Sequence, residues 1–255
     1  MPRAWCGRPL GALCQLGLCG TLSAAGHVAS TVNLSRHNQY RVADTDLYIF
    51  FSEEEEGEGI QRWLQPLLPP TRPLVFLPQC QSPNLGDRLL HALEVVLARG
   101  HTIAMVSGSD VPDLSAHHFE AALAAVRPPA QYHATFGPAA DGGYYLLALR
   151  SPSQSLPQGL FDGIVWSASD VLKASLAAAE QSGLAVAPLT GLPVLRDIDT
   201  HSDLEAWAAA AKAAIKFSPR EGMAAASGKQ HQQELLALAC SILTASRGKQ
   251  EKQQL

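Results

Sequence analysis

Short apolar runs alternate with longer segments of helical periodicity from Leu47 onward, and this alternation limits the folds open to the chain. The runs lead into loops rich in Gly, Ser or Asp, as buried strands do, and two of the periodic segments end at Gly100 and Gly183. Strands that alternate with helices of about ten to fifteen residues indicate βαβ units. We therefore expect an α/β fold with a mainly parallel sheet, with strands at 47–51, 74–77, 102–106, 133–136, 144–149 and 185–189, helices at 85–99, 115–126, 169–182 and 202–215, and a helix beginning at the acidic run 53–56.

The composition is that of a globular protein. The chain has 255 residues, 47% of them hydrophobic, and its 19 basic and 23 acidic residues give a formal net charge of −4. No basic stripe with interleaved aromatic residues occurs, so nucleic acid is not an expected partner. We expect a single domain at 44–217, followed at 218–255 by a linker, a short amphipathic helix that docks on the domain or binds a partner, and a solvated tail.

The first 43 residues differ from the rest, because they contain four arginines and no acidic residue. This bias is typical of an organellar transit peptide, for a chloroplast or a mitochondrion; a secretory signal and an incorrect first exon are the alternatives. The segment is too short and too interrupted for a membrane span. We expect it to be poorly packed or cleaved. The five cysteines form no CxxC pair, which favours a reducing compartment, cytoplasmic or organellar.

Two isolated carboxylates follow apolar runs. Asp110 comes after the run 102–106. Asp141 comes after the run 133–136 and opens an Asp-Gly-Gly sequence that leads into the next run at Tyr144. Carboxylates at the carboxyl ends of strands lie where open α/β sheets bind ligands. Asp110 could instead cap the helix near Ser115, although Asp113 and Ser115 are closer to it. Asp141 could simply belong to a tight hairpin turn.

Five sequence blocks in order resemble the GT-A-like nucleotide-diphospho-sugar transferases of the radical-SAM/selenodomain-associated transferase 1 type, which are related to 2-phospho-L-lactate guanylyltransferase. They extend over about half of the chain and read QSPNLGDRL from Gln81, GSDVPDL from Gly108, GPAADGGYYLLAL from Gly137, LFDGIVWS from Leu160 and DIDTHSDL from Asp197. The resemblance implies a single Rossmann-like domain of the GT-A type. It also implies a metal-dependent transferase, a glycosyltransferase that uses a nucleotide sugar, with a nucleotidyltransferase as the alternative.

The resemblance also implies site residues. Asp110 and Asp199 are expected to hold Mg²⁺ or Mn²⁺ on one side of the sheet, with Asp197 a weaker candidate, because a hard cation held by carboxylates neutralises a diphosphate. Asp141 is expected to bind the donor or acceptor and to act as the catalytic base. The expected substrate-binding residues are Arg88, Gly142, Gly143, Tyr144 and Trp166. The alternatives are a capping role for the Asp199 segment, a surface ion pair for Arg88 and plain packing for Trp166.

The chain departs from the family pattern at its front. Family members begin with a strand and a glycine-containing loop that ends in a basic K-T-R-L signature for the nucleotide phosphates, and the first thirty residues contain no equivalent. Ser82 and Asn84 replace the family's Gly and Asp in the first block. Each lost charge-assisted contact removes on the order of 1.5–3 kcal/mol of binding free energy. A catalytically impaired paralogue is therefore a further alternative.

Overall fold

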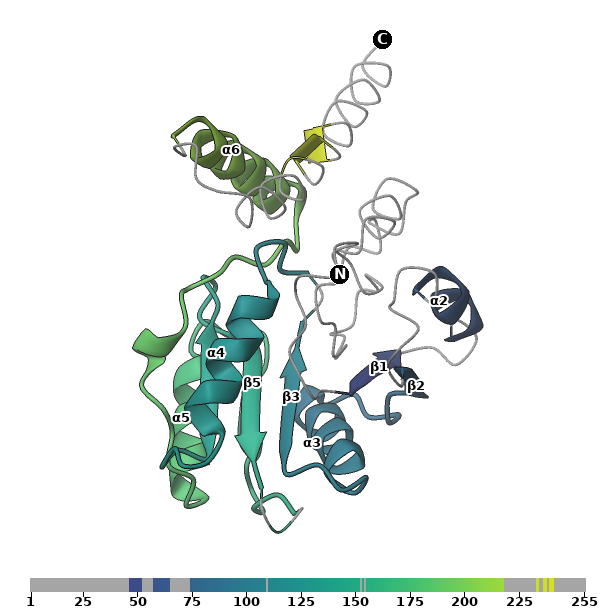
Figure 1. The fold of residues 1–255 in the computed structure, drawn as a ribbon, viewed down its shortest axis with the longest axis vertical. Helices are drawn as coiled ribbons and strands as arrows, with labels where there is room; N and C mark the ends of the chain where they lie inside the picture. The colour runs from purple at the N-terminus through teal and green to yellow at the C-terminus, as the bar shows by residue number, and fades with distance from the viewer. Residues whose placement is uncertain are drawn as a thin grey trace.

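The computed structural model describes residues 46–51, 57–64, 74–108, 110–151, 153 and 155–217, together with 233, 236, 237, 239 and 240. The predictions for residues 1–43 and for the acidic run 53–56 lie outside the described residues. So does most of the predicted tail region, although the five described residues between 233 and 240 are helical. The elements are β1 (Leu47–Phe51), α2 (Gly57–Leu64), β2 (Leu74–Pro78), α3 (Leu85–Leu97), β3 (Ile103–Ser107), α4 (Ala116–Val126), β4 (Ala134–Pro138), β5 (Tyr144–Arg150), α5 (Val171–Gln181), η3 (Leu189–Gly191) and α6 (His201–Phe217) (Figure 1).

The α/β class is confirmed, whereas a single, mainly parallel sheet is not. Strand β1 pairs with β2 in parallel, and a second sheet has the order β3-β5-β4, in which β5 runs antiparallel to both neighbours. The cause is the connection before β5. Only residues 139–143 separate β4 from β5, and a parallel connection needs a crossover of about a dozen residues or more, so the two strands form a hairpin.

The strand expected at 185–189 is reduced to one pairing. Val186 forms an isolated parallel bridge with Ala134, and the 3-10 turn η3 begins at Leu189. Pro188 precedes that turn and cannot donate a ladder hydrogen bond, which accounts for the early end of the pairing.

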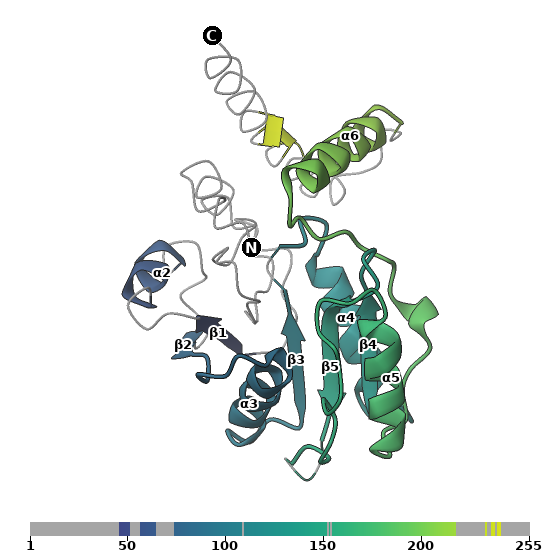
Figure 2. The same ribbon diagram turned by 180° about the vertical axis from the view of Figure 1, so that it is seen from behind.

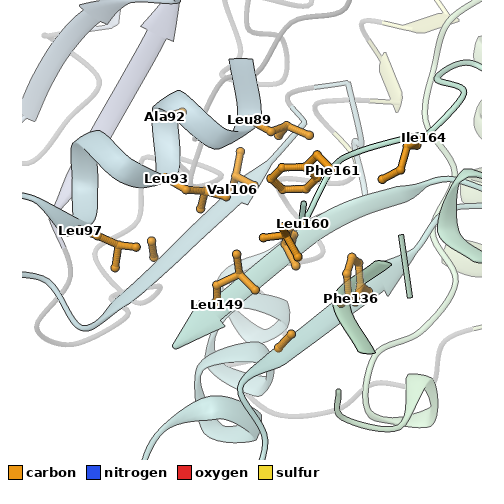
Figure 3. Close-up of a cluster of buried hydrophobic side chains, with 14 of the residues drawn as sticks. Leu89, Ala92, Leu93, Leu97, Val106, Phe136, Leu149, Leu160, Phe161 and Ile164 are labelled. Carbon is orange, nitrogen blue, oxygen red and sulfur yellow. The ribbon is translucent and has the colours of Figure 1, made fainter. Parts of the chain in front are cut away.

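Helices cover both faces of the β3-β5-β4 sheet. One face packs Leu147 and Leu149 of β5 against α3 and α5, and the other packs Leu146 and Ala148 against α4. In Figure 1 α4 lies in front of β5, and the reverse view in Figure 2 brings α5 to the front. Figure 3 shows the first core, in which α3 lies over β3 and the segment 160–164 adds further apolar side chains. This segment leads directly to Trp166.

Within the described residues, no helix has the length and apolar character needed to cross a membrane. The predicted transit peptide and the predicted cellular location depend on residues 1–43 and stay predictions.

Candidate functional site

A pocket lies where β3 ends and β5 begins. Because β3 and β4 both run antiparallel to β5, the end of β3 and the turn between β4 and β5 meet at one edge of the sheet. The cavity there has a volume of about 240 Å³. Its lining includes four aspartates and a group of apolar and aromatic side chains, Leu85, Leu89, Val106, Tyr144, Trp166 and Val171.

The four aspartates are Asp110, Asp141, Asp197 and Asp199. Burial raises the pKa of Asp110, Asp197 and Asp199, and the negative charges of neighbouring aspartates raise each pKa further. None of the described residues that line the pocket is a lysine, an arginine or a histidine. The site therefore gathers negative charge that its own lining does not neutralise.

Asp110 is bound into the site through its backbone. Its carbonyl oxygen accepts a hydrogen bond from the backbone N–H of Ile198 at 2.9 Å, which places the segment with Asp197 and Asp199 beside it. The alternative capping role belongs to another residue, because Ser115 is the N-cap of α4 and its N–H donates to Nδ1 of His118 at 3.0 Å. Asp110 is therefore not needed to begin the helix.

Asp199 is also free of the capping role that was its alternative. Thr200 and Asp203 form a reciprocal pair at the start of α6: Thr200 donates to the Asp203 carboxylate from N–H at 2.8 Å and from Oγ1 at 2.6 Å, and the Asp203 N–H donates back to Oγ1 at 3.2 Å. These hydrogen bonds lower the pKa of Asp203. Asp199 lies one residue before this pair, in the pocket lining.

Asp141 lies within the turn between β4 and β5, so the hairpin alternative is correct for the backbone. Its Oδ1 accepts the Gly143 N–H at 2.8 Å, and its side chain is exposed at the pocket. Gly142 has φ +95°, and a Cβ there would overlap the Ser169 carbonyl oxygen. The Gly142 carbonyl accepts the Leu172 N–H at 2.9 Å. The turn that carries Asp141 is thus fixed to the start of α5.

The two tyrosines behave as strand alternation predicts. Tyr144 packs toward the α3 and α5 side, with its ring 5.2 Å from the Phe136 ring, and Tyr145 belongs to the α4 core. Burial raises the pKa of both phenols, that of Tyr145 to about 12. The Tyr145 hydroxyl donates to the Pro193 carbonyl at 3.2 Å. Both side chains reach the pocket as neutral phenols at neutral pH.

Most of the predicted site residues are brought together, and two are not. The lining includes Asp110, Asp141, Gly143, Tyr144, Trp166 and Asp199, but neither Gly142 nor Arg88. Gly142 supports the turn, as described above. Arg88 Nη1 lies 3.5 Å from Gln79 Oε1, at the end of β2. No ion pair with Asp87 or Glu94 was found for it within the described residues, so the surface-pair alternative gains no support.

Leu85 and Ser167 are among the lining residues that the sequence did not single out. Leu85 begins α3, and Ser167 has φ +66°, a left-handed conformation that is unusual for a residue other than glycine. Nothing in the sequence marks Ser167, since its conformation depends on how 160–168 folds over the first core. Such conformations are concentrated at functional sites.

A ready-made metal centre was not found. No three His, Cys, Asp or Glu side chains among the described residues are arranged to hold an ion. The donor chemistry nevertheless fits a hard divalent cation, because the lining offers several carboxylates with raised pKa values and no basic residue. Mg²⁺ is usually held by one or two carboxylates together with water and substrate phosphates, and not by a complete protein cage.

Comparisons with known proteins agree on a broad class. Residues 37–168 match the family described as "Uncharacterized protein conserved in bacteria (DUF2064)". A crystal structure from Desulfovibrio desulfuricans G20, named a "putative nucleotide-diphospho-sugar transferase", is similar at 28% sequence identity and a TM-score of 0.58, with 79% of this chain and 78% of that chain covered. No curated protein matches the sequence.

Proposed function

Since the chain belongs to the family of uncharacterized proteins conserved in bacteria (DUF2064), and is similar to the Desulfovibrio protein, we propose that its pocket is the active site of a metal-dependent glycosyltransferase that uses a nucleotide sugar. The observation that carries the proposal is the group of four aspartates at the carboxyl end of β3, in a lining whose described residues include no basic side chain. We propose in addition that the chain has the single-domain GT-A architecture that the sequence resemblance implies.

Asp110 and Asp199 would hold Mg²⁺ or Mn²⁺, with Asp197 beside them. The ion would supply the positive charge that a departing diphosphate requires. The proposal is supported by the backbone link between Asp110 and Ile198, which places both carboxylates in one pocket, and by their raised pKa values. Burial is the main cause of the raised pKa values and repulsion from neighbouring aspartates adds to it, and a bound cation would offset both effects.

The remaining residues would orient the substrates. Asp141 is exposed at the pocket on a turn fixed to α5, so its carboxylate is available to accept a proton from an acceptor hydroxyl. Tyr144 and Trp166 would offer aromatic surface, and Gly143 would allow the backbone to approach a ligand closely. Arg88 is not among the described lining residues, so any contact that it makes with a substrate phosphate would come from outside this lining.

A catalytically impaired paralogue is the second candidate, and one observation favours it. The K-T-R-L signature is missing from the sequence, and the described lining supplies no lysine or arginine in its place. A nucleotidyltransferase would need such cations even more, because it must hold a triphosphate.

Calorimetry on the full chain separates these candidates. Uridine, guanosine and cytidine diphosphates and their sugars are titrated with and without Mg²⁺ or Mn²⁺ into wild type, Asp110→Asn and the control Asp162→Asn, an exposed aspartate outside the pocket lining. We expect binding that needs the metal in wild type and in the control, and none in Asp110→Asn. Equal, metal-independent binding in all three proteins would refute the mechanism. A wild type that binds none of these ligands would favour the impaired paralogue.

A further inference from the structure

Asn84 joins two segments of the pocket that lie far apart in the sequence. Its Oδ1 accepts the Gly86 N–H at 2.7 Å, as the N-cap of α3, and the indole Nε1–H of Trp166 at 3.0 Å. Trp166 is 82 residues further along the chain and lines the pocket. One carboxamide oxygen therefore caps the start of α3 and also holds an aromatic ring of the site.

The chemistry of this contact requires an acceptor at position 84. Two N–H donors converge on one oxygen and use both of its lone pairs, so only a side chain with a carbonyl or carboxylate oxygen at this reach serves both. Asparagine and aspartate satisfy that condition. Alanine satisfies neither donor.

Packing contacts one side of the half-buried Trp166 ring. A Cβ on Gly86 would lie 3.0 Å from Phe161 Cβ and 3.2 Å from Trp166 Cζ2. The Phe161 ring lies 6.2 Å from the Trp166 ring, at a tilt of 46°. The indole is thus held by Phe161 and the bare Gly86 backbone, while Asn84 fixes its N–H edge.

We propose that Asn84 is a positioning residue that holds the Trp166 ring in the pocket lining, where the ring contacts the non-polar face of a ring in the ligand. The ligand contact rests on the proposed function, whereas the positioning of Trp166 does not. Sugar rings and nucleobases both present such a face to an aromatic side chain, and the choice between them is left to the experiment.

Fluorine NMR of protein labelled with 5-fluorotryptophan tests the positioning. The chain has four tryptophans, and Trp166→Phe assigns the signal of Trp166. In Asn84→Ala we expect this signal to move toward the position of solvent-exposed indole, with a larger H₂O/D₂O shift, while Asn84→Asp keeps the wild-type signal. Glu94→Ala is the control, because it alters an exposed residue of α3 outside the hydrogen bonds that Asn84 makes with Ser82, Gly86 and Trp166. A wild-type Trp166 signal in Asn84→Ala would overturn the proposal.

Titration of uridine diphosphate and UDP-glucose, each with Mn²⁺, tests the ligand contact. Loss of one hydrogen bond predicts a dissociation constant for Asn84→Ala that is about threefold to tenfold higher than that of Glu94→Ala. An increase for both ligands assigns the contact to the base, and an increase for UDP-glucose alone assigns it to the sugar. Unchanged affinity for both would overturn the ligand contact. If wild type binds neither ligand, the proposed function and the ligand contact fail together, and the fluorine signal still decides the role of Asn84.

Discussion

Replacement of Gly142 by alanine should destabilise the protein far more than the same change at a glycine with almost the same backbone angle. Gly142 has φ +95° and Gly100 has φ +96°. A Cβ at Gly142 would overlap the carbonyl oxygen of Ser169, whereas a Cβ at Gly100 would have no heavy atom within 4 Å. Alanine at either position would therefore have a similar strained φ angle, but only alanine at position 142 would collide with neighbouring atoms.

The expected magnitudes follow from that difference. Left-handed strain costs about 1–2 kcal/mol in either variant. Overpacking at Gly142 adds about 1–3 kcal/mol, because the obstacle is backbone and cannot rotate away. We thus expect Gly142→Ala to lose roughly 2–5 kcal/mol of unfolding free energy, a large share of the about 5–15 kcal/mol that holds a domain folded. Gly100→Ala should lose only the first contribution.

Urea unfolding followed by circular dichroism measures both losses. The Gly142 carbonyl also holds the Leu172 N–H, so displacement of the turn should weaken any ligand binding that depends on Asp141. Equal losses for the two variants would refute the argument, since they would show that the turn and the start of α5 are not packed as closely as described.

Three further predictions concern charge. Burial and neighbouring aspartates raise the pKa of Asp110, so the stability that its protonated form contributes is fully present below the ordinary value of 3.8 and is lost as pH rises through the folded-state value. As pH rises above about 4, metal-free Asp110→Asn should therefore lose less unfolding free energy than wild type, and parallel curves would contradict this. Saturating Mg²⁺, at about 100 times its dissociation constant, should stabilise wild type by about 2.7 kcal/mol in thermal unfolding but not Asp199→Asn, and an equal gain in both would exclude Asp199 as a ligand. Hydrogen bonds from Thr200 lower the pKa of Asp203, so the stability that its carboxylate contributes is present above the ordinary value of 3.8 and is lost as pH falls through the folded-state value. Asp203→Ala should therefore cost about 0.5–2 kcal/mol of unfolding free energy in urea at neutral pH and less in acid. A cost that does not depend on pH would refute the role of the carboxylate.

Local patterns predicted the elements well and their pairing less well. The periodicity of 85–99 and its stop at Gly100 predicted α3 to within two residues, because helix period and helix ends are local properties. The antiparallel direction of β5 followed only from the alternative of a hairpin turn at Asp141, whereas the favoured prediction was a mainly parallel sheet. The alternation of strands and helices favoured parallel strands, and this general pattern was given more weight than the short length of the connection between β4 and β5.

The site was predicted where it depended on residues that follow strands, and missed where it depended on contacts across the fold. Asp110 and Asp141 follow apolar runs, so the sequence pointed to both. The bond between Asn84 and Trp166 joins the start of one helix to a loop after the last strand, and no local pattern reports it. Arg88 shows the converse, since a position near a helix start did not place it in the described lining.

The antiparallel direction of β5 also explains why the carboxylates meet. In a hairpin, the turn after β4 lies at the end where β4 finishes, and β3 finishes at that same end because it too runs antiparallel to β5. Asp110 after β3 and Asp141 in the β4–β5 turn are therefore brought to one edge by the direction of β5. A parallel β5 would need a crossover to the far end of the sheet, and residues 139–143 would have to be replaced by a longer connection. The short glycine-containing turn thus fixes both the topology of the sheet and the position of the Asp141 carboxylate.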